Sequence, residues 1–106
     1  MRRLELTGER EVTAAGSVGA RVRRLAPEAH VVVIEIAAGG VVARHPAVVT
    51  QLFAVVRGSG WVSGDDGKRE PIVAGEAVVW DPGEEHESGS DVGMTALVVE
   101  ADSLES

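Results

Sequence analysis

With 106 residues, the chain is expected to form one domain over residues 1–106 that buries its own core. Seventeen acidic and ten basic residues give a formal charge of -7, which disfavours binding to a phosphate backbone, so we expect no nucleic-acid partner. The chain has no cysteine, which excludes disulfides and thiol chemistry. No signal-like segment and no run of about 18 apolar residues occurs, so we expect a cytoplasmic protein without a membrane partner.

Short alternating segments begin the chain. Residues 2–7 and residues 18–23 each alternate apolar and polar positions, which is typical of half-buried strands. His30 to Ile36, HVVVIEI, is rich in β-branched residues and is apolar on both faces apart from Glu35. This pattern predicts a central strand or a strand covered by a partner subunit, and it is our sequence-based reason to expect a homodimer.

The remainder of the chain reads as more short strands with glycine-bearing turns between them. Arg57 to Gly60 is predicted as a bend, and Gly64 to Gly67, GDDG, as a hairpin turn. No ten-residue stretch has a helical period. The expected strands are residues 51–56, 61–62, 72–73, 77–80, 84–88 and 94–100. Such a succession of strands favours an antiparallel sandwich or barrel.

Two spaced motifs lie within this pattern. In the first, Gly39 is followed by five residues, His45, one residue, Ala47, three residues, Gln51, six residues and Gly58. In the second, five residues separate Gly75 from Asp81-Pro82-Gly83, then two residues precede His86 and three more precede Ser90.

These motifs resemble the two motifs of the cupin superfamily. The first family motif has His-x-His and a glutamate between its glycines, and the second has Pro-x-Gly, a histidine and an asparagine. The resemblance implies an all-β fold, an antiparallel jelly-roll β-barrel of the small, single-domain RmlC-like kind. It also implies a small-molecule ligand in the barrel and a homodimer.

The resemblance also implies a site, with departures from the family pattern. Metal-binding cupins hold a divalent ion with two histidines and the glutamate of the first motif plus the histidine of the second. The matching positions here are His45, Ala47, Gln51 and His86, so one imidazole is absent and an amide replaces the carboxylate. The reduced ligand set is His45, Gln51 and His86, and zinc, iron, nickel and manganese are equally open. We expect a pocket lined by these three residues together with Ala47 and Phe53.

Two neutral imidazoles and one amide oxygen form an uncharged set, whereas hard cations prefer carboxylates. His30, Glu84 or Glu85 could supply a further ligand, although a packed histidine and an acidic loop are the ordinary interpretations. Arg44 and Arg57 are the cations nearest the first motif and could receive an anion, or could simply be solvated.

Three functions therefore stay open. The first is a metal-dependent enzyme, and the second is a metal-free acid/base enzyme such as an isomerase or epimerase. The third is a non-catalytic ligand-binding or regulatory module. One fold serves all three, so the fold does not decide among them.

Overall fold

A computed structural model describes residues 1–3, 10–11, 21–22 and 28–102 of the chain. Within these residues every regular element is a β-strand, and the paired strands are antiparallel. Of the expected strands at residues 2–7 and 18–23, only the parts at β1 (Arg2–Arg3) and β3 (Arg21–Val22) are described, and the rest lies outside the described residues. A further short strand, β2 (Arg10–Glu11), pairs with β3.

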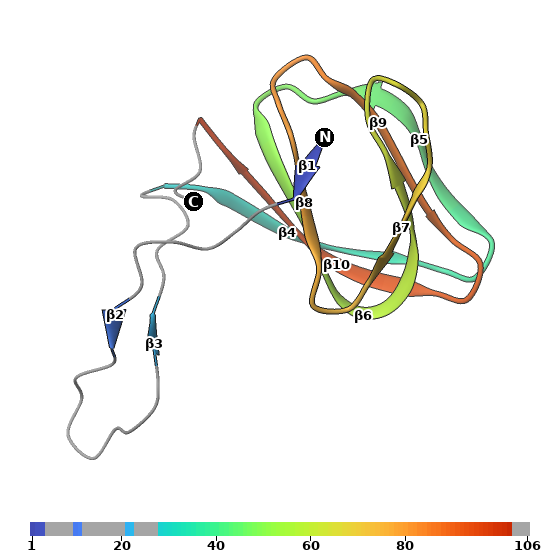
Figure 1. The fold of residues 1–106 in the computed structure, drawn as a ribbon, viewed down its shortest axis with the longest axis horizontal. Helices are drawn as coiled ribbons and strands as arrows, with labels where there is room; N and C mark the ends of the chain where they lie inside the picture. Colours follow the sequence, from blue (N-terminus) through green and yellow to red (C-terminus); the bar gives the residue numbers. More distant parts are fainter. Residues whose placement is uncertain (4–9, 12–20, 23–27, 103–106) are drawn as a thin grey trace.

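Apart from β2 and β3, the strands form a curled sheet of two layers (Figure 1). One layer has the order β1-β8-β6-β10-β4, and β5, β9 and β7 complete the other. The strands are β4 (His30–Ile36), β5 (Gly40–Pro46), β6 (Thr50–Ser63), β7 (Glu70–Val73), β8 (Ala77–Trp80), β9 (Glu85–Ser90) and β10 (Met94–Ala101). The predicted all-β antiparallel jelly-roll barrel is therefore confirmed.

The long strand β6 joins the two layers. Its first half pairs with β8 and β10, and its second half, from Ser59, pairs with β7 and β9. The predicted bend at residues 57–60 therefore does not end the strand. Gly58, at a φ of 77°, lies where β6 passes between the layers, and a Cβ there would collide with the carbonyl oxygen of Gly93. Only glycine fits both constraints without strain.

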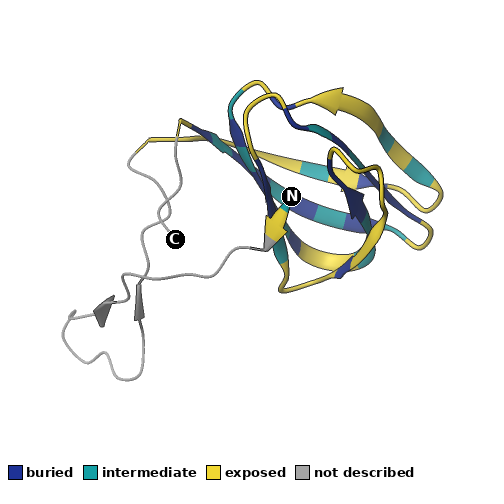
Figure 2. Ribbon diagram, turned by 45° about the horizontal axis from the view of Figure 1, so that its top comes forward, coloured by how far each residue is buried: buried dark blue, intermediate teal, exposed yellow. Residues whose placement is uncertain are grey.

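The main core fills the space between the layers. Alternate residues of β6, such as Phe53 and Val55, face this space and are about 2% exposed. The intervening residue Leu52 faces the other way and packs with Val79 and Val99 in a second cluster. Figure 2 shows the contrast between largely buried β9 and the mostly exposed β4 and β5. The period-two alternation expected for residues 51–56 is thus observed.

Candidate functional site

Two histidines from different strands lie against each other. His45 lies near the end of β5 and His86 near the start of β9, and they are direct partners in the β5–β9 ladder. Their ring centroids are 4.2 Å apart at an interplanar angle of 56°. His86 is 3% exposed, whereas His45 is exposed. The two motifs, about forty residues apart in sequence, therefore bring one imidazole each to the same place.

Both imidazoles are oriented by the same local contact. Nδ1 of His45 lies 2.7 Å from the carbonyl oxygen of Ala43, and Nδ1 of His86 lies 3.2 Å from that of Glu84. A carbonyl oxygen only accepts, so each Nδ1 carries the hydrogen and donates it. In the neutral ring Nε2 is then an unprotonated acceptor. The pair therefore presents two lone pairs for a ligand.

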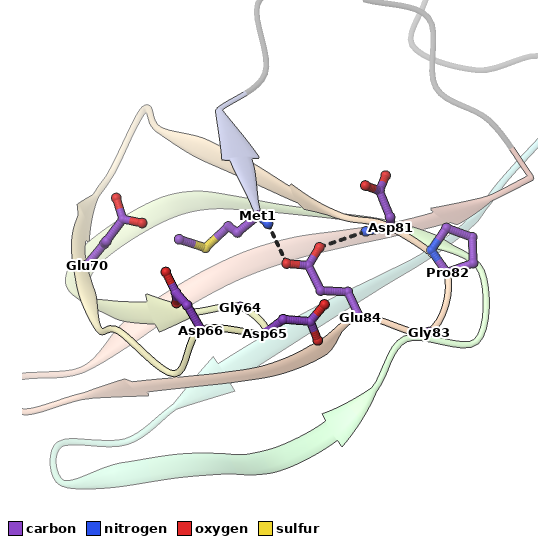
Figure 3. Close-up of a pocket in the computed structure, with 9 residues that line it drawn as sticks. All are labelled: Met1, Gly64, Asp65, Asp66, Glu70, Asp81, Pro82, Gly83 and Glu84. Atoms are coloured by element: carbon purple, nitrogen blue, oxygen red, sulfur yellow. Dashed lines mark hydrogen bonds and ion pairs between the residues drawn. The ribbon is translucent and has the colours of Figure 1, made fainter.

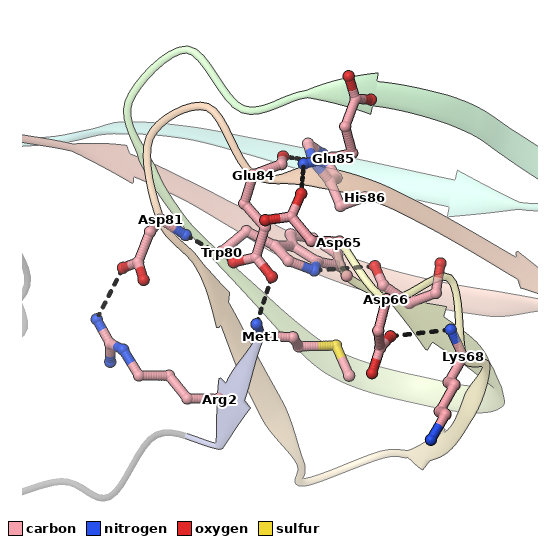
Figure 4. Close-up of polar contacts among 12 residues, drawn as sticks. Met1, Arg2, Asp65, Asp66, Lys68, Trp80, Asp81, Glu84, Glu85 and His86 are labelled. Carbon is pink, nitrogen blue, oxygen red and sulfur yellow. Dashed lines mark hydrogen bonds and ion pairs between the residues drawn. The ribbon is translucent and has the colours of Figure 1, made fainter.

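The environment of His86 keeps its ring neutral. Its pKa is lowered mainly by burial, and the nearby His45 lowers it further, while the hydrogen bond to the Glu84 carbonyl acts in the opposite direction. Trp80 stacks on the same ring, with centroids 4.3 Å apart and an angle of 26° (Figure 4). The Trp80 indole is itself held by a 3.0 Å hydrogen bond from Nε1 to the carbonyl oxygen of Ser63. His86 is thus fixed on two sides.

A cavity of about 170 Å³ adjoins the histidine pair, and we call it the barrel cavity. Its described lining comes from β4, β5, β6, β8, β9 and β10, so strands of both layers contribute. The polar lining residues are His45, Gln51, His86, Ser88 and Glu100, and the apolar ones are Val32, Ile34, Val42, Phe53, Trp80 and Val98. An apolar wall with a few convergent polar groups is the usual composition of a small-molecule site.

Gln51 and Glu100 form a second polar pair in the cavity. They are direct partners between β6 and β10, and Gln51 Nε2 donates a 2.9 Å hydrogen bond to Glu100 Oε1. Because the amide nitrogen is engaged, Gln51 Oε1 and the second carboxylate oxygen of Glu100 remain for other partners. The position that holds an amide in the first motif is thus directly beside a carboxylate from another strand.

The structure places the predicted pocket residues in two groups. His45, Gln51, Phe53 and His86 all line the barrel cavity. Ala47 does not: it is 4% exposed, packs in the main core and exchanges backbone hydrogen bonds with the loop at residues 83–84. The reason is that β5 ends at Pro46, so Ala47 lies beyond the strand and does not follow the alternation that would place it on the face of His45.

The other candidate residues lie elsewhere. His30 is exposed at the start of β4. Glu84 accepts hydrogen bonds from the α-amino group of Met1 and from the Asp81 amide, and the Glu85 amide donates to Asp65 (Figure 4). Arg44 donates to the carbonyls of residues 64 and 65. Neither these side chains nor Arg57 belong to the described lining of the barrel cavity.

Seven of the eleven described lining residues were not identified from the sequence, and three of them bear on the chemistry of the cavity. Ser88 follows His86 by two positions, so strand periodicity could have found it. Glu100 shares a face with Val98 in the predicted last strand, but a charged residue at a strand end was easily taken for a solvent-facing one. Trp80, in the predicted strand at residues 77–80, packs in the main core, and its ring also forms part of the cavity wall.

A larger hollow, of about 580 Å³, lies beside the barrel and is lined by acidic loops (Figure 3). Its carboxylates come from Asp65, Asp66, Glu70, Asp81 and Glu84. Burial raises the pKa of Glu84, but the hydrogen bonds that it accepts from the Met1 amino group and the Asp81 amide, with the positive charge of that amino group, together lower it below its ordinary value. Glu84, Asp65 and Asp66 already accept hydrogen bonds from backbone amides. These carboxylates therefore have a structural role in holding the loops around the hollow.

The donor groups of the barrel cavity do not match an ordinary metal centre. A catalytic zinc site uses three protein ligands besides its open position. Here the motif positions supply two imidazole nitrogens and one amide oxygen. Glu100 lines the same cavity, but in the described part of the chain no three His, Cys, Asp or Glu residues cluster closely enough to hold an ion. Metal binding by His45, Gln51 and His86 is therefore left as an untested expectation from the sequence, and we assign no chemical step to a metal.

Comparisons with known proteins agree on the fold. No protein-family model and no curated protein matches the sequence. Among solved structures, a conserved protein with a double-stranded β-helix domain from Klebsiella pneumoniae matches with a TM-score of 0.64 and 21% identity over 85% of this chain and 88% of that one. An RmlC-like cupin family protein with the same fold from Methanocaldococcus jannaschii matches with a TM-score of 0.65 and 12% identity over 74% of each chain.

A cupin-like protein from Thermotoga maritima gives a TM-score of 0.65 and 17% identity over 70% of this chain, and the match spans 57% of the Thermotoga protein. Identities this low carry the architecture and not the chemistry. Within the described residues, no helix is long and apolar enough to cross a membrane.

Proposed function

Because the chain has the cupin fold, the double-stranded β-helix, we propose that it binds a small molecule in the barrel cavity against the His45–His86 pair. One observation carries the proposal. Both imidazoles donate Nδ1–H to a backbone carbonyl two residues earlier, which leaves two adjacent Nε2 lone pairs beside the same cavity.

The volume of the cavity limits the ligand. Apolar cavities of about 150 Å³ accept benzene, and the barrel cavity measures about 170 Å³. The ligand, or the part of it that enters, therefore has about four to eight non-hydrogen atoms. Phe53, Trp80 and the cavity valines would contact its apolar surface, while His86 and Gln51 would meet its polar atoms.

Proton transfer is a second candidate function, which the lowered pKa of His86 favours. A neutral imidazole can accept a proton from a bound ligand, and the protonated ring can then return that proton to another position of the ligand, directly or through the second imidazole. Such a pair could serve an isomerase or epimerase. The metal-dependent enzyme remains the alternative from the sequence. The binding step is common to all three functions and is therefore the step to test first.

The experiment is a screen of fragments of up to eight non-hydrogen atoms by NMR. The ring signals of His86 and the indole N–H of Trp80 report on the cavity, and the indole of Trp61, which lies outside the cavity lining beneath Arg69, is the internal reference. Binders should shift the first two signals and leave the third in place. Val42→Phe, which directs a larger ring into the cavity, should abolish these shifts, and a screen without such binders contradicts the proposal.

We also propose that a second copy of the chain covers β4. In the described residues β4 pairs with β10 alone, and Val31 and Val33 are 58% and 61% exposed on the face that continues to Leu97 and Val99. An edge strand with unpaired backbone groups is a template for another strand. Two copies of the same edge can pair antiparallel about a two-fold axis, which satisfies both at once.

A further inference from the structure

We propose that the barrel cavity selects a small cationic ligand, such as an amidinium or a protonated amine, over a carboxylate of the same shape. The inference rests on the proposed function, since it concerns the ligand of the same cavity. Its basis is the carboxylate of Glu100, which no sequence motif indicated. Glu100 reaches the cavity from β10 and is held there by the amide of Gln51.

The charged residues around the cavity disfavour an anionic ligand. Glu100 is the one carboxylate among the described lining residues, and that lining includes no lysine or arginine. The cations near the first motif are directed elsewhere, because Arg44 donates to the carbonyls of residues 64 and 65, and Arg57 lines a separate hollow. An anionic ligand would therefore meet a carboxylate and two imidazole lone pairs, with no described cation to offset its charge.

The orientation of the histidines strengthens this preference. Nδ1 of each ring donates to a backbone carbonyl, so in the neutral ring Nε2 is an acceptor and not a donor. Within the described chain, Nε2 of His86, which is 3% exposed and lines the cavity, accepts no hydrogen bond. Lone pairs at His45 and His86 together with a carboxylate at Glu100 make a set of acceptors. Such a set suits a ligand that carries several N–H donors.

A second hollow, next to the barrel cavity, is also lined by acidic residues. This hollow, of about 580 Å³, shares Glu100 with the barrel cavity and is also lined by Glu28 and Asp102. His30, the partner of Glu100 across the β4–β10 ladder, lines it too. With three carboxylates in its lining, the shared hollow raises the local concentration of a cation.

The test compares acetamidinium, acetamide and acetate, which share one planar shape and differ in charge. Each is titrated at pH 8 and constant ionic strength, in buffer that contains a chelator, and the Trp80 indole shift gives the apparent Kd. We expect acetamidinium to bind most tightly and acetate most weakly. Glu100→Gln keeps the side-chain length and should weaken acetamidinium by about tenfold, as the loss of a hydrogen bond to a charged group implies.

Asp102→Asn is the matched control, because this residue lines the neighbouring hollow and not the barrel cavity. It should change the acetamidinium Kd much less than Glu100→Gln does. Acetate binding as tightly as acetamidinium, or an acetamidinium Kd that Glu100→Gln leaves unchanged, overturns the charge selection while ligand binding stands. If neither these probes nor the fragments shift Trp80, both proposals are overturned.

Discussion

His45 and His86 face each other directly across the β5–β9 ladder, with ring centroids 4.2 Å apart. His86 is the more buried of the two. Burial lowers the pKa of His86, and the charge of His45 at this separation lowers it further. Protonation of His86 is therefore linked to the stability of the fold.

The first prediction is that folding stability falls as the pH drops below about 6.5. Burial lowers the pKa of His86 in the folded chain, so the unfolded chain binds this proton first and is favoured at lower pH. Stability from the neutral ring is complete above about pH 6.5 and is lost as the pH falls toward the folded pKa. Urea unfolding between pH 5 and 8 should show a steeper loss in the wild type than in His86→Gln.

Glu84 gives a separate acid transition. Its pKa is lowered in the folded chain, so its contribution is present above the ordinary value near 4.5 and is lost as the pH falls below it. The two transitions should therefore separate, and Glu84→Gln should flatten only the lower one. Equal pH slopes between pH 5 and 8 in the wild type and His86→Gln would show that His86 is not the group responsible.

The second prediction concerns metal content. Protein purified without a metal-chelating tag should contain well below one zinc, iron, nickel or manganese ion per chain, because two imidazoles and an amide oxygen form a weak ligand set. Elemental analysis of the wild type and His86→Ala measures this. One ion per chain in the wild type that is lost in His86→Ala would instead establish the metal site at His45, Gln51 and His86.

The sequence predicts the fold well because its strands are short, alternating and separated by glycine turns. His30–Ile36 and Ala77–Trp80 are strands with the bounds expected from the pattern. The passage through residues 57–60 was not predictable, because glycine and serine indicate a turn locally. Pairing of β6 with β7 and β9 maintains the strand there. Tertiary hydrogen bonding thus overrides the local signal.

The candidate site was predictable only where a motif marks it. Motif spacing identifies His45, Gln51 and His86, all of which line the barrel cavity. Glu100 lies in the cavity because the register of β6 and β10 pairs it with Gln51. Register is a property of the folded sheet, and residue spacing within one strand does not predict it. Ala47 shows the converse: it occupies a motif position, but it does not line the barrel cavity, because β5 ends before it.

The third prediction tests the proposed dimer. Val33→Glu places a charge on the exposed outer face of β4, where burial against a second copy would desolvate it, so it should shift the chain to a monomer. Sedimentation velocity at matched concentrations measures the change. Val48→Glu is the control, because Val48 is 91% exposed and lies outside the strands. A wild type that sediments as a monomer, or a Val33→Glu variant that remains a dimer, would contradict the interface.

The fourth prediction concerns the close approach of β6 and β9 beneath the site. A Cβ at Gly60 would collide with the backbone carbonyl oxygen of Gly89 in the paired strand, and backbone atoms cannot rotate away. Gly60→Ala should therefore separate the strands and destabilise the chain by about 1–3 kcal/mol, the usual cost of overpacking, or by more.

Gly67→Ala is the matched control for this variant. Gly67 has a φ of 70° but open space around its Cβ position, so alanine there meets only backbone strain of about 1–2 kcal/mol. Urea unfolding of both variants at pH 7.5 gives the comparison, and we expect the larger loss in Gly60→Ala. The Trp80 indole signal should also shift in Gly60→Ala and not in Gly67→Ala, because β9 carries His86, on which Trp80 stacks. A Gly60→Ala variant as stable as Gly67→Ala would mean that β6 and β9 lie further apart than the structure has them.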